Sequence, residues 1–585
     1  MAKSSKTLIA LLAIAAIALV TGGFLVTRRS PGDPARPSGT PSSAAPSRGG
    51  ALTASSRSEP ATYNRYVDQA AAGELLSLLT QAPLVRVNRT TDVLEPWLAE
   101  SWTQSSDRQT FTIKLRRGIT FSDGTPFSSA DVIFSFAALY DPRVNAVLAS
   151  EMLVSGKPLA VEAPDSWTVI LRMAAPSALG LRIIESLPML PKHKLQGALD
   201  AGQFNDAWAV ASPLSDLAGM GPFVLTEHVS GQRLVFARNS HYWRKDPDGV
   251  RLPYLDTLNV VILADQNSEA LRLQRGEIDL MANGEIRAED YPAFRRIAEQ
   301  GALRLIDAGV GVDPNVLWFN LGTASAADSR GSWLRSKAFR QAVSCAVDRQ
   351  AIVNTVHFGA AVPIYTPITP GNRTWYSPVR PSCEHDPKKA RELFAIAGLS
   401  DRDADGMLED SRGAPARFSI LTQQGHTIRQ RTASVLQEQL RQAGIRVDVA
   451  GLDPQALAQR WSRGDYDAIY FGVQASGTDP VLNSQFWLSS GNFHFWNPRQ
   501  PSPSTDWERR IDDLFVAQSV AAGLPDRQRL ITDAQRVLAE ELPAIYFVAP
   551  KVTLAVSRRV LNPRPAPLMP QLLWSADSLA AASPR

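Results

Sequence analysis

Residues 96–142 read PWLAESWTQSSDRQTFTIKLRRGITFSDGTPFSSADVIFSFAALYDP, and this stretch decides the fold. Within it, Phe111, Ile113 and Leu115 alternate with polar residues, a period of two that is typical of a half-buried strand. The Asp123-Gly124 pair that follows is a strong turn signal. The pattern therefore predicts a β-meander that ends in a turn.

Helices are predicted on both sides of these strands. Ser128 can cap a helix that begins near Ser129 and runs toward Leu139. Upstream, the leucine-rich run 75–79 predicts another helix, which ends before Pro83 because proline disfavours the helical conformation in the residue before it. The segment is therefore expected to mix strands and helices.

Many positions of the quoted stretch fall in register with a known pattern of the form P-x-L-A-x-S-W, then a strand, then L-R-x-G-x-x-F-x-D-G-x-P-F. The chain resembles, at this point, the family 5 bacterial extracellular solute-binding proteins, which are the peptide- and nickel-binding receptors of ABC importers. The matching positions are Pro96 to Ser101-Trp102, Leu115-Arg116, Gly118, Phe121, Asp123-Gly124, Pro126-Phe127 and Ala130-Asp131-Val132.

Further short matches to the same family follow in chain order. Each one alone has a local explanation such as a turn or a cap, but together they cover residues 60 to about 550. They are Leu190-Pro191-Lys192-His193, Gly219 to Phe223, Asn239 to Trp243, Gly276 to Asp279, Trp318-Phe319-Asn320, Phe339 to Asp348, Asp386 to Ala390, Gly444-Ile445 and Gly464 to Asp467.

The resemblance implies an α/β architecture, a two-lobed periplasmic-binding-protein type II fold with an additional subdomain inserted in the first lobe. The length of 585 residues agrees with more than one core, since single cores stop growing near ~250–300 residues. The two chain crossings of the hinge are expected near residues 310 and 547. The boundaries carried over are 60–85, 190–310 and 547–585 for lobe I, 86–189 for the inserted subdomain, and 311–546 for lobe II.

The same resemblance implies a function. The chain is expected to be the extracytoplasmic substrate-binding protein of an ABC importer, and not an enzyme. It would capture a small solute, a short peptide or peptide-like compound, between its lobes by hinge closure and deliver it to the permease. We expect a monomer with no cofactor.

The N-terminus predicts export. Lys3 and Lys6 precede the uncharged run Leu8–Val26, which is the arrangement of a signal peptide. The run has 19 residues, enough to span a bilayer, so residues 1–30 are a signal peptide or an N-terminal membrane anchor. Residues 31–59, rich in Pro, Ser and Gly, are predicted to be a disordered linker. The body would then lie in the periplasm or outside the cell, free or anchored to the inner membrane by residues 8–26.

An uncleaved anchor keeps a second function open. The chain would then be a membrane-tethered ligand sensor or scaffold with the same binding fold but no dedicated importer. Nucleic acid is excluded as a partner, because the net charge is only +4 and no stripe of basic residues is interleaved with aromatic ones.

Catalytic and metal motifs are lacking in the sequence. It contains no GxSxG or HExxH motif, and none of its seven histidines sits four residues from another. Its two cysteines, Cys345 and Cys383, form no CxxC motif and are either a disulfide pair or two separate thiols. Asp401, Asp403 and Asp405 imitate the first half of a calcium loop, but the twelfth position is Arg412 instead of a bidentate Glu. We predict no metal site.

The loop 471–487 is the main ligand candidate. In the peptide-binding members of the family this loop carries an acid that pairs with the α-amino group of the peptide. Counting back from Pro480 places that position at Ser476, beside Gly477, and a serine cannot supply a charge-assisted bond to an ammonium group. Asp479 is the nearby acid that could replace it, although an Asp-Pro pair also starts ordinary turns.

Aromatic residues crowd the segment after this loop. Trp487, Phe495 and Trp496 are predicted to line the ligand cleft, since clefts for small ligands have aromatic walls with few polar groups. The alternative is that they belong to the core of lobe II. Trp318 and Asn320, close to the expected hinge, are further candidates for ligand contact.

Overall fold

The computed structural model describes residues 48–68, 70–322, 330–472 and 478–582. The segment predicted as a signal peptide or anchor lies outside these ranges. Within them, no helix combines the length and the apolar character needed to cross a membrane. The predicted linker is wrong at its C-terminal end, because Ala51–Ser56 form strand β1. Small and polar residues suffice there, since the strand is held by backbone pairing to a neighbour on each side.

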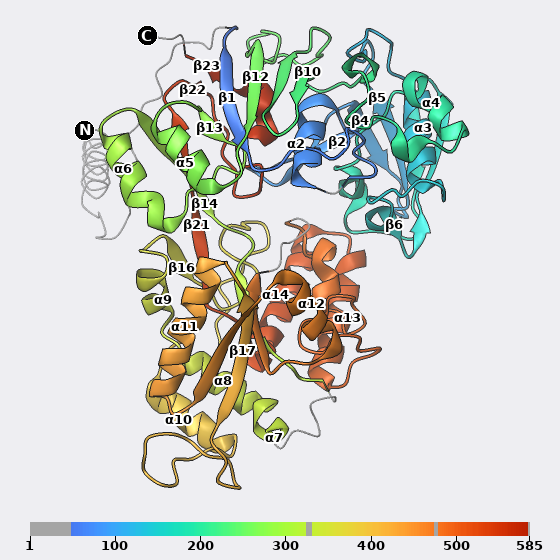
Figure 1. The fold of residues 1–585 in the computed structure, drawn as a ribbon. Coiled ribbons are helices and arrows are strands. Elements are labelled where there is room, and N and C mark those ends of the chain that lie inside the picture. The colour runs from blue at the N-terminus through green and yellow to red at the C-terminus, as the bar shows by residue number, and fades with distance from the viewer. Residues whose placement is uncertain (1–47, 69, 323–329, 473–477, 583–585) are drawn as a thin grey trace, which may run out of the picture. The chain divides into compact units, whose positions relative to one another are not determined.

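Lobe I is built on a five-stranded sheet of order β10-β11-β12-β1-β13 (Figure 1). Strand β1 runs parallel to both neighbours, whereas β10 and β11 are antiparallel. The elements are β10 Phe223–Val229, β11 Arg233–Arg238, β12 Thr257–Ile262, β13 Leu280–Met281, α2 Ala71–Thr80, α5 Gln266–Gln274, α6 Tyr291–Glu299, β22 Val560–Leu561, β23 Ala580–Ala581 and the 3₁₀ helix η8 Leu573–Ser578.

The inserted region contains an antiparallel sheet of order β4-β5-β9-β8 and two short hairpins. The strand predicted from the alternation at 111–115 is confirmed as β5, and the predicted helix as α3, whose Ser128 forms a capping box with Asp131. The elements are β2 Val85–Asn88, β3 Val93–Pro96, β4 Ala99–Gln104, β5 Thr110–Leu115, α3 Ser129–Tyr140, β6 Leu153–Val154, β7 Lys157–Pro158, β8 Ala160–Asp165, β9 Thr168–Arg172 and α4 Lys192–Asp200.

One apolar core runs through lobe I and the inserted region. It includes Leu52 and Phe236 from the first sheet together with Ile113 and Phe127 from the inserted segment. The inserted strands therefore pack onto lobe I as an extension of its core.

Two antiparallel strands connect lobe I to lobe II. They are β14 Leu303–Val310 and β21 Val548–Ser557, which pair with each other, and the short β16 Ala361–Pro363 pairs with the other edge of β21. The chain leaves β14 for the lobe II strand β15 Asn315–Phe319 and returns from β20 Ala544–Tyr546 into β21. Only residues 311–314 and Phe547 separate the strands of the two sheets, so these short steps form the hinge (Figure 1).

Lobe II has a mixed five-stranded sheet of order β18-β17-β19-β15-β20, with helices on both faces. Along β15, Leu317 and Phe319 enter one core while Val316 and Trp318 enter another, as the period of two requires. The remaining elements are α7 Gly331–Leu334, α8 Lys337–Ala346, α9 Arg349–Thr355, α10 Pro387–Ile396, β17 Arg417–Gln423, α11 Thr427–Gln442, β18 Arg446–Leu452, α12 Pro454–Arg463, β19 Ala468–Gly472, the 3₁₀ helix η7 Pro480–Phe486, α13 Asp506–Val520 and α14 Leu524–Glu541.

A disulfide ties two parts of lobe II together. Cys345, in α8, is bonded to Cys383, which precedes α10. The sequence left open whether these cysteines pair, and the structure joins them. A structural disulfide is typical of proteins outside the reducing cytosol.

Candidate ligand-binding site

A pocket of about 90 Å³ opens in lobe II beside the hinge. Its walls come from the crossing segment at 312–316, the loop at 367–372, η7, and helices α13 and α14. The lining is mainly apolar, and a few polar side chains such as Asn372 and Gln535 interrupt it. Such a mixture suits a small ligand that is held by shape and oriented by a few hydrogen bonds.

Phe495 is the centre of the aromatic wall of this pocket. Its ring stacks on Phe486 with centroids 5.1 Å apart, and Trp487 meets it edge-on at 5.6 Å. All three line the pocket, so two of the predicted residues, Trp487 and Phe495, are brought together there. Trp318 stacks on Phe495 at 5.0 Å but is not part of the lining.

Two other predicted ligand residues lie inside lobe II. Trp496 is 0% exposed, and its indole N–H donates to Glu508 at 3.0 Å. The amide of Asn320 donates to the carbonyl oxygens of Gly464 and Tyr466. Neither Trp496 nor Asn320 lines the pocket. The polar groups of both side chains are hydrogen-bonded within lobe II.

Asp479 is committed to a buried ion pair. Its carboxylate accepts two bonds from Arg527, of 3.0 Å and 2.5 Å, and the two residues are 2% and 6% exposed. The carboxylate of Asp479 accepts a third hydrogen bond, from the backbone N–H of Val481, so Asp479 also caps η7. Such a bidentate, desolvated pair saturates the carboxylate. Asp479 is therefore not placed to receive the ammonium group of a ligand.

Ser476 and Gly477 lie outside the described residues. Thr478, the described residue that follows them, reaches the inserted region of lobe I. Its hydroxyl donates to Asp92 at 2.5 Å and accepts from Arg182 at 2.8 Å, and Arg182 is also paired with Asp92. The loop carrying the predicted site is thus bonded across the two lobes.

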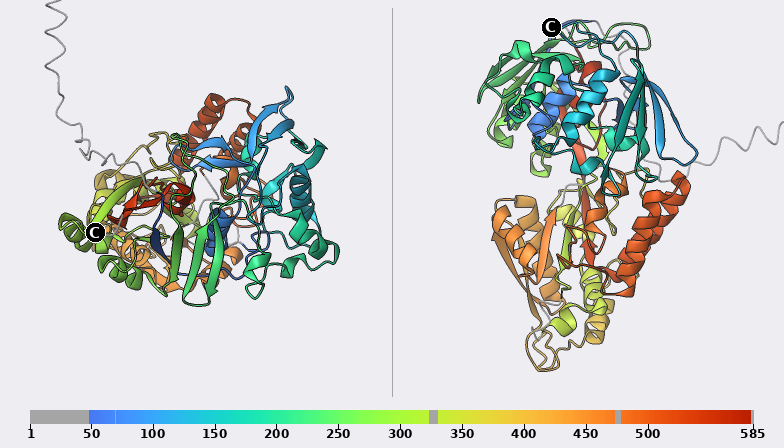
Figure 2. Two further views of the ribbon diagram at one scale, coloured as in Figure 1. Left: turned by 90° about the horizontal axis from the view of Figure 1, so that it is seen from above. Right: turned by 90° about the vertical axis from the view of Figure 1, so that its right-hand side faces the viewer.

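More contacts between the lobes surround this point. The N–H of Ala178 donates to the carbonyl of Ser519 at 2.8 Å, and Arg108 donates to the carbonyl of Val520 at 2.7 Å. Both acceptors lie at the C-terminal end of α13, on the side of lobe II that faces the inserted strands (Figure 2). Arg527 adds a longer bond of 3.4 Å to the carbonyl of Ala178. The lobes are therefore connected at the hinge and, separately, by these polar contacts.

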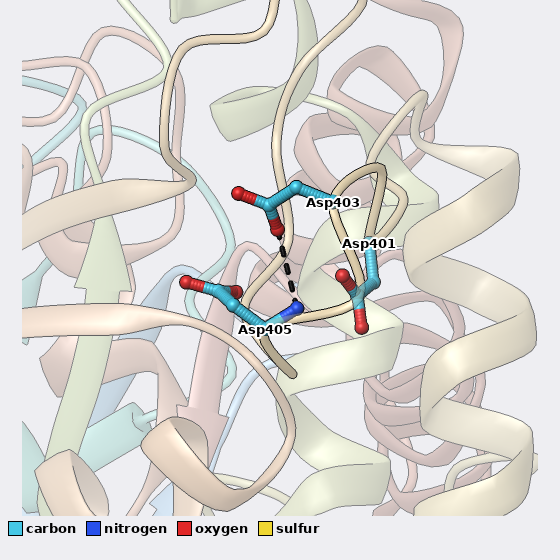
Figure 3. Close-up of side chains that lie close together, drawn as sticks. All are labelled: Asp401, Asp403 and Asp405. Atoms are coloured by element: carbon cyan, nitrogen blue, oxygen red, sulfur yellow. Dashed lines mark hydrogen bonds between the residues drawn. The ribbon is translucent and has the colours of Figure 1, made fainter.

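The loop that contains Asp401, Asp403 and Asp405 is stabilised by hydrogen bonds from its own backbone N–H groups. Oxygen atoms of Asp401, Asp403 and Asp405 lie within 4.8 Å of one another on the surface (Figure 3). Each carboxylate accepts a backbone N–H, and the one from Asp405 to Asp403 is 3.2 Å long. Glu409 turns inward to the N–H of Arg402. These bonds explain the cluster as a turn without requiring a metal.

Comparison with known proteins agrees with this architecture. The sequence profile of the "Bacterial extracellular solute-binding proteins, family 5 Middle" matches residues 93–495. The chain belongs to this family.

Similar proteins bind different ligands. A probable ABC transporter-binding protein of Deinococcus radiodurans is 26% identical over 525 residues, covering 85% of this chain and 86% of the relative. The oligopeptide-binding protein AppA of Bacillus subtilis is 26% identical over 439 residues, or 74% and 75% of the two chains. The crystal structure of NikA from Brucella suis in complex with Fe(III)-EDTA has a TM-score of 0.75 at 22% identity and covers 91% of this chain and 100% of that one.

The family assignment confirms three predictions. The fold is the two-lobed type II α/β fold, the chain is a solute-binding protein of the ABC-transporter class, and it is not an enzyme. Family 5 solute-binding proteins are periplasmic or otherwise extracytoplasmic, and they have a small-molecule or peptide ligand and a permease partner.

Sequence reasoning missed the buried ion pair between Arg527 and Asp479 inside lobe II. Arg527 occupies the buried face of α14, four residues before Ile531, where an apolar residue is expected. A charged residue on the otherwise apolar face of this helix was the signal in the sequence that could have indicated a buried ion pair. Its partner Asp479 lies 48 residues away in the sequence, however, and no spacing rule connects the two.

Proposed function

We propose that this family 5 solute-binding protein captures a short peptide or peptide-like compound between its lobes and delivers it to an ABC permease as a monomer. The observation that supports this most is the aromatic pocket beside the hinge, which is lined in part by the crossing segment that joins the lobes. The lining residue Thr478 is bonded to Asp92 and Arg182 of the inserted region, so a ligand in the pocket can act on the contact that favours the closed arrangement of the lobes.

The pocket favours a ligand with an apolar group at the bound end. Phe486, Trp487 and Phe495 offer it ring faces and edges, and Asn372 and Gln535 offer it amide groups. By the register counted back from Pro480, Ser476 would stand where peptide-binding relatives carry an acid for a free α-amino group. We therefore propose an N-terminally blocked peptide or an amide-rich compound in preference to a free peptide.

Native mass spectrometry of the purified protein tests the proposal by identifying the compound that co-purifies with it. Thermal unfolding against a library of free peptides, blocked peptides, sugars and amino-acid derivatives gives a second readout, because a ligand that binds only the folded state raises Tm. Phe486→Ala should remove most of the shift, and Phe358→Ala, an exposed phenylalanine of lobe II outside the pocket, should keep it. Absence of any co-purifying compound and of any shift would contradict the proposal.

A further inference from the structure

Several residues from the family-like motifs meet where the inserted region packs on lobe I, away from the pocket in lobe II. They line a second cavity of about 670 Å³ between the chain that follows β5 and the chain that follows β11. Arg116 comes from the L-R-x-G motif and Trp243 from the N-x-x-Y-W motif. The ligand site described above uses neither residue.

The wall of this cavity is held firmly. The Nε of Arg116 donates to the carbonyl of Trp97 at 2.7 Å, and its guanidinium lies 5.1 Å from the ring of Trp243. Trp97 and Trp243 pack edge to face with centroids 5.4 Å apart. The two chain segments that border the cavity are linked by a 3.2 Å contact between the hydroxyl of Thr120 and the Nδ1 of His241. Binding here would cost little ordering of the framework.

The lining carries an excess of positive charge. Arg116, Arg117, Lys245 and Arg251 contribute basic groups, and Glu100 is the single carboxylate among the lining residues. Within the described ranges, no ion pair neutralises any of the four basic side chains, whereas most other arginines of the body have an acidic partner. A concave surface with one sign of charge concentrates the potential and attracts the opposite ion.

A buried donor on one of the lining residues adds to this argument. The indole N–H of Trp243 is buried and has no hydrogen-bond acceptor within the described part of the chain. An indole N–H can only donate, so the group it lacks is an acceptor. Leaving such a group unpaired in the interior is unfavourable. The basic side chains and the unpaired indole N–H of Trp243 therefore both favour a ligand with several anionic oxygen atoms.

We propose that this cavity is a second binding site, separate from the solute site, for a phosphate-type oxyanion. Arg117, Lys245 and Arg251 would supply charge-assisted bonds, and Arg116 would fix the position of the anion against Trp243. A free phosphate, a phosphorylated solute and a phospholipid headgroup share this chemistry.

Calorimetric titration of the full-length protein with inorganic phosphate at low ionic strength tests the site directly. The wild type should show saturable binding, and the double variant Arg117→Gln/Lys245→Gln should bind at least ~10-fold more weakly, since each substitution removes a hydrogen bond to a charged group. The matched control Arg431→Gln/Arg510→Gln makes the same charge change at exposed positions of lobe II and should bind as the wild type does.

Sedimentation with vesicles separates the two sources of the anion. Vesicles containing phosphatidylglycerol are compared with neutral phosphatidylcholine vesicles for the same three proteins. Phosphate binding that only the cavity variant loses assigns the site to a soluble anion. A preference for phosphatidylglycerol that only the cavity variant loses assigns it to a headgroup. Equal behaviour of the cavity and control variants in both assays would overturn the proposal.

Discussion

At the scale of single residues, Asp479 was predicted to contact the ligand, but in the structure its carboxylate stabilises lobe II. The Asp-Pro pair lies in the loop expected to bind the ligand, yet the carboxylate is buried against Arg527 and bonded to it twice. Removal of either partner would leave an unpaired buried charge, which makes the pair a poor candidate for exchange with a ligand. Ser476 therefore stays the position where an acid would matter most.

Ser476→Asp tests that position. If the register with the peptide-binding relatives holds, the new carboxylate forms a charge-assisted bond with a free α-amino group and strengthens the binding of free peptides about ten-fold or more. Affinities of a free peptide and its N-acetylated form for wild type and variant provide the measurement. An equal gain for both forms, or none for either, would show that the register is wrong.

Glu285 predicts a pH dependence of stability. Burial raises the pKa of this carboxyl from 4.5 to about 7. The folded protein therefore binds more protons than the unfolded chain between about pH 4.5 and 7, and the free energy of unfolding falls as the pH rises through this window. The loss amounts to about 2–3 kcal/mol.

Urea denaturation at pH 5 and pH 8 measures this loss. Glu285→Gln should reduce the difference between the two pH values, because an amide does not ionise. The exposed Glu299→Gln should leave the difference unchanged. A pH dependence that is the same in all three proteins would rule out Glu285 as its source.

At the scale of elements, lobe II depends on how its helices are fixed to the two faces of the sheet. Alternate residues of β15 enter separate cores, so different helices cover the two faces of the sheet. The Cys345–Cys383 disulfide adds a covalent link on the face covered by α8 and α10. It constrains a loop in the unfolded chain as well as the folded one.

Removal of this disulfide should lower the stability of lobe II. The bridge spans a sequence separation of 38 residues, and a disulfide of this kind contributes about 2–4 kcal/mol. Cys345→Ala/Cys383→Ala should lower the Tm, whereas a reductant should change the Tm of the wild type but not that of the double variant. An unchanged Tm in the double variant would show that the bridge adds nothing to stability.

At the scale of the whole body, the two lobes are joined by the hinge strands and by the polar contacts around Thr478. These contacts, unlike the covalent hinge, must break when the lobes separate. The hydroxyl of Thr478 makes two of them, to Asp92 and Arg182. The inserted region thus acts on the lobe II loop in which the ligand is expected to bind.

Thr478→Val should favour the open arrangement, since it removes both bonds while nearly preserving the volume of the side chain. Loss of a hydrogen bond to a charged group costs about 1.5–3 kcal/mol, enough to raise the open fraction about ten-fold or more. Small-angle X-ray scattering should show a larger radius of gyration, and ligand should dissociate faster. Thr103→Val, at an exposed position of β4, is the control. Identical scattering and release in both variants would contradict the role of the contact.

The sequence by itself determined the local elements and the family. Strand β5 follows from the alternation around Ile113, and α3 from the cap at Ser128, because both depend on neighbouring residues only. The order of the motifs along the chain led to the two-lobed fold. It did not reveal β1, whose residues 51–56 carry a weak pattern and are held by strands more than 200 positions away.

Only the tertiary structure decided which functional candidates share a site. Trp487 and Phe495 meet at the pocket, whereas Trp496, equally aromatic and one residue from Phe495, points into the core. Residues 495 and 496 lie in an irregular bend with no regular period, so the direction of each side chain depends on what packs against it. The partners of Asp479 and Thr478 also come from distant parts of the chain. A buried charge is paired with whichever group the fold brings next to it, and the distance along the sequence does not predict which group that is.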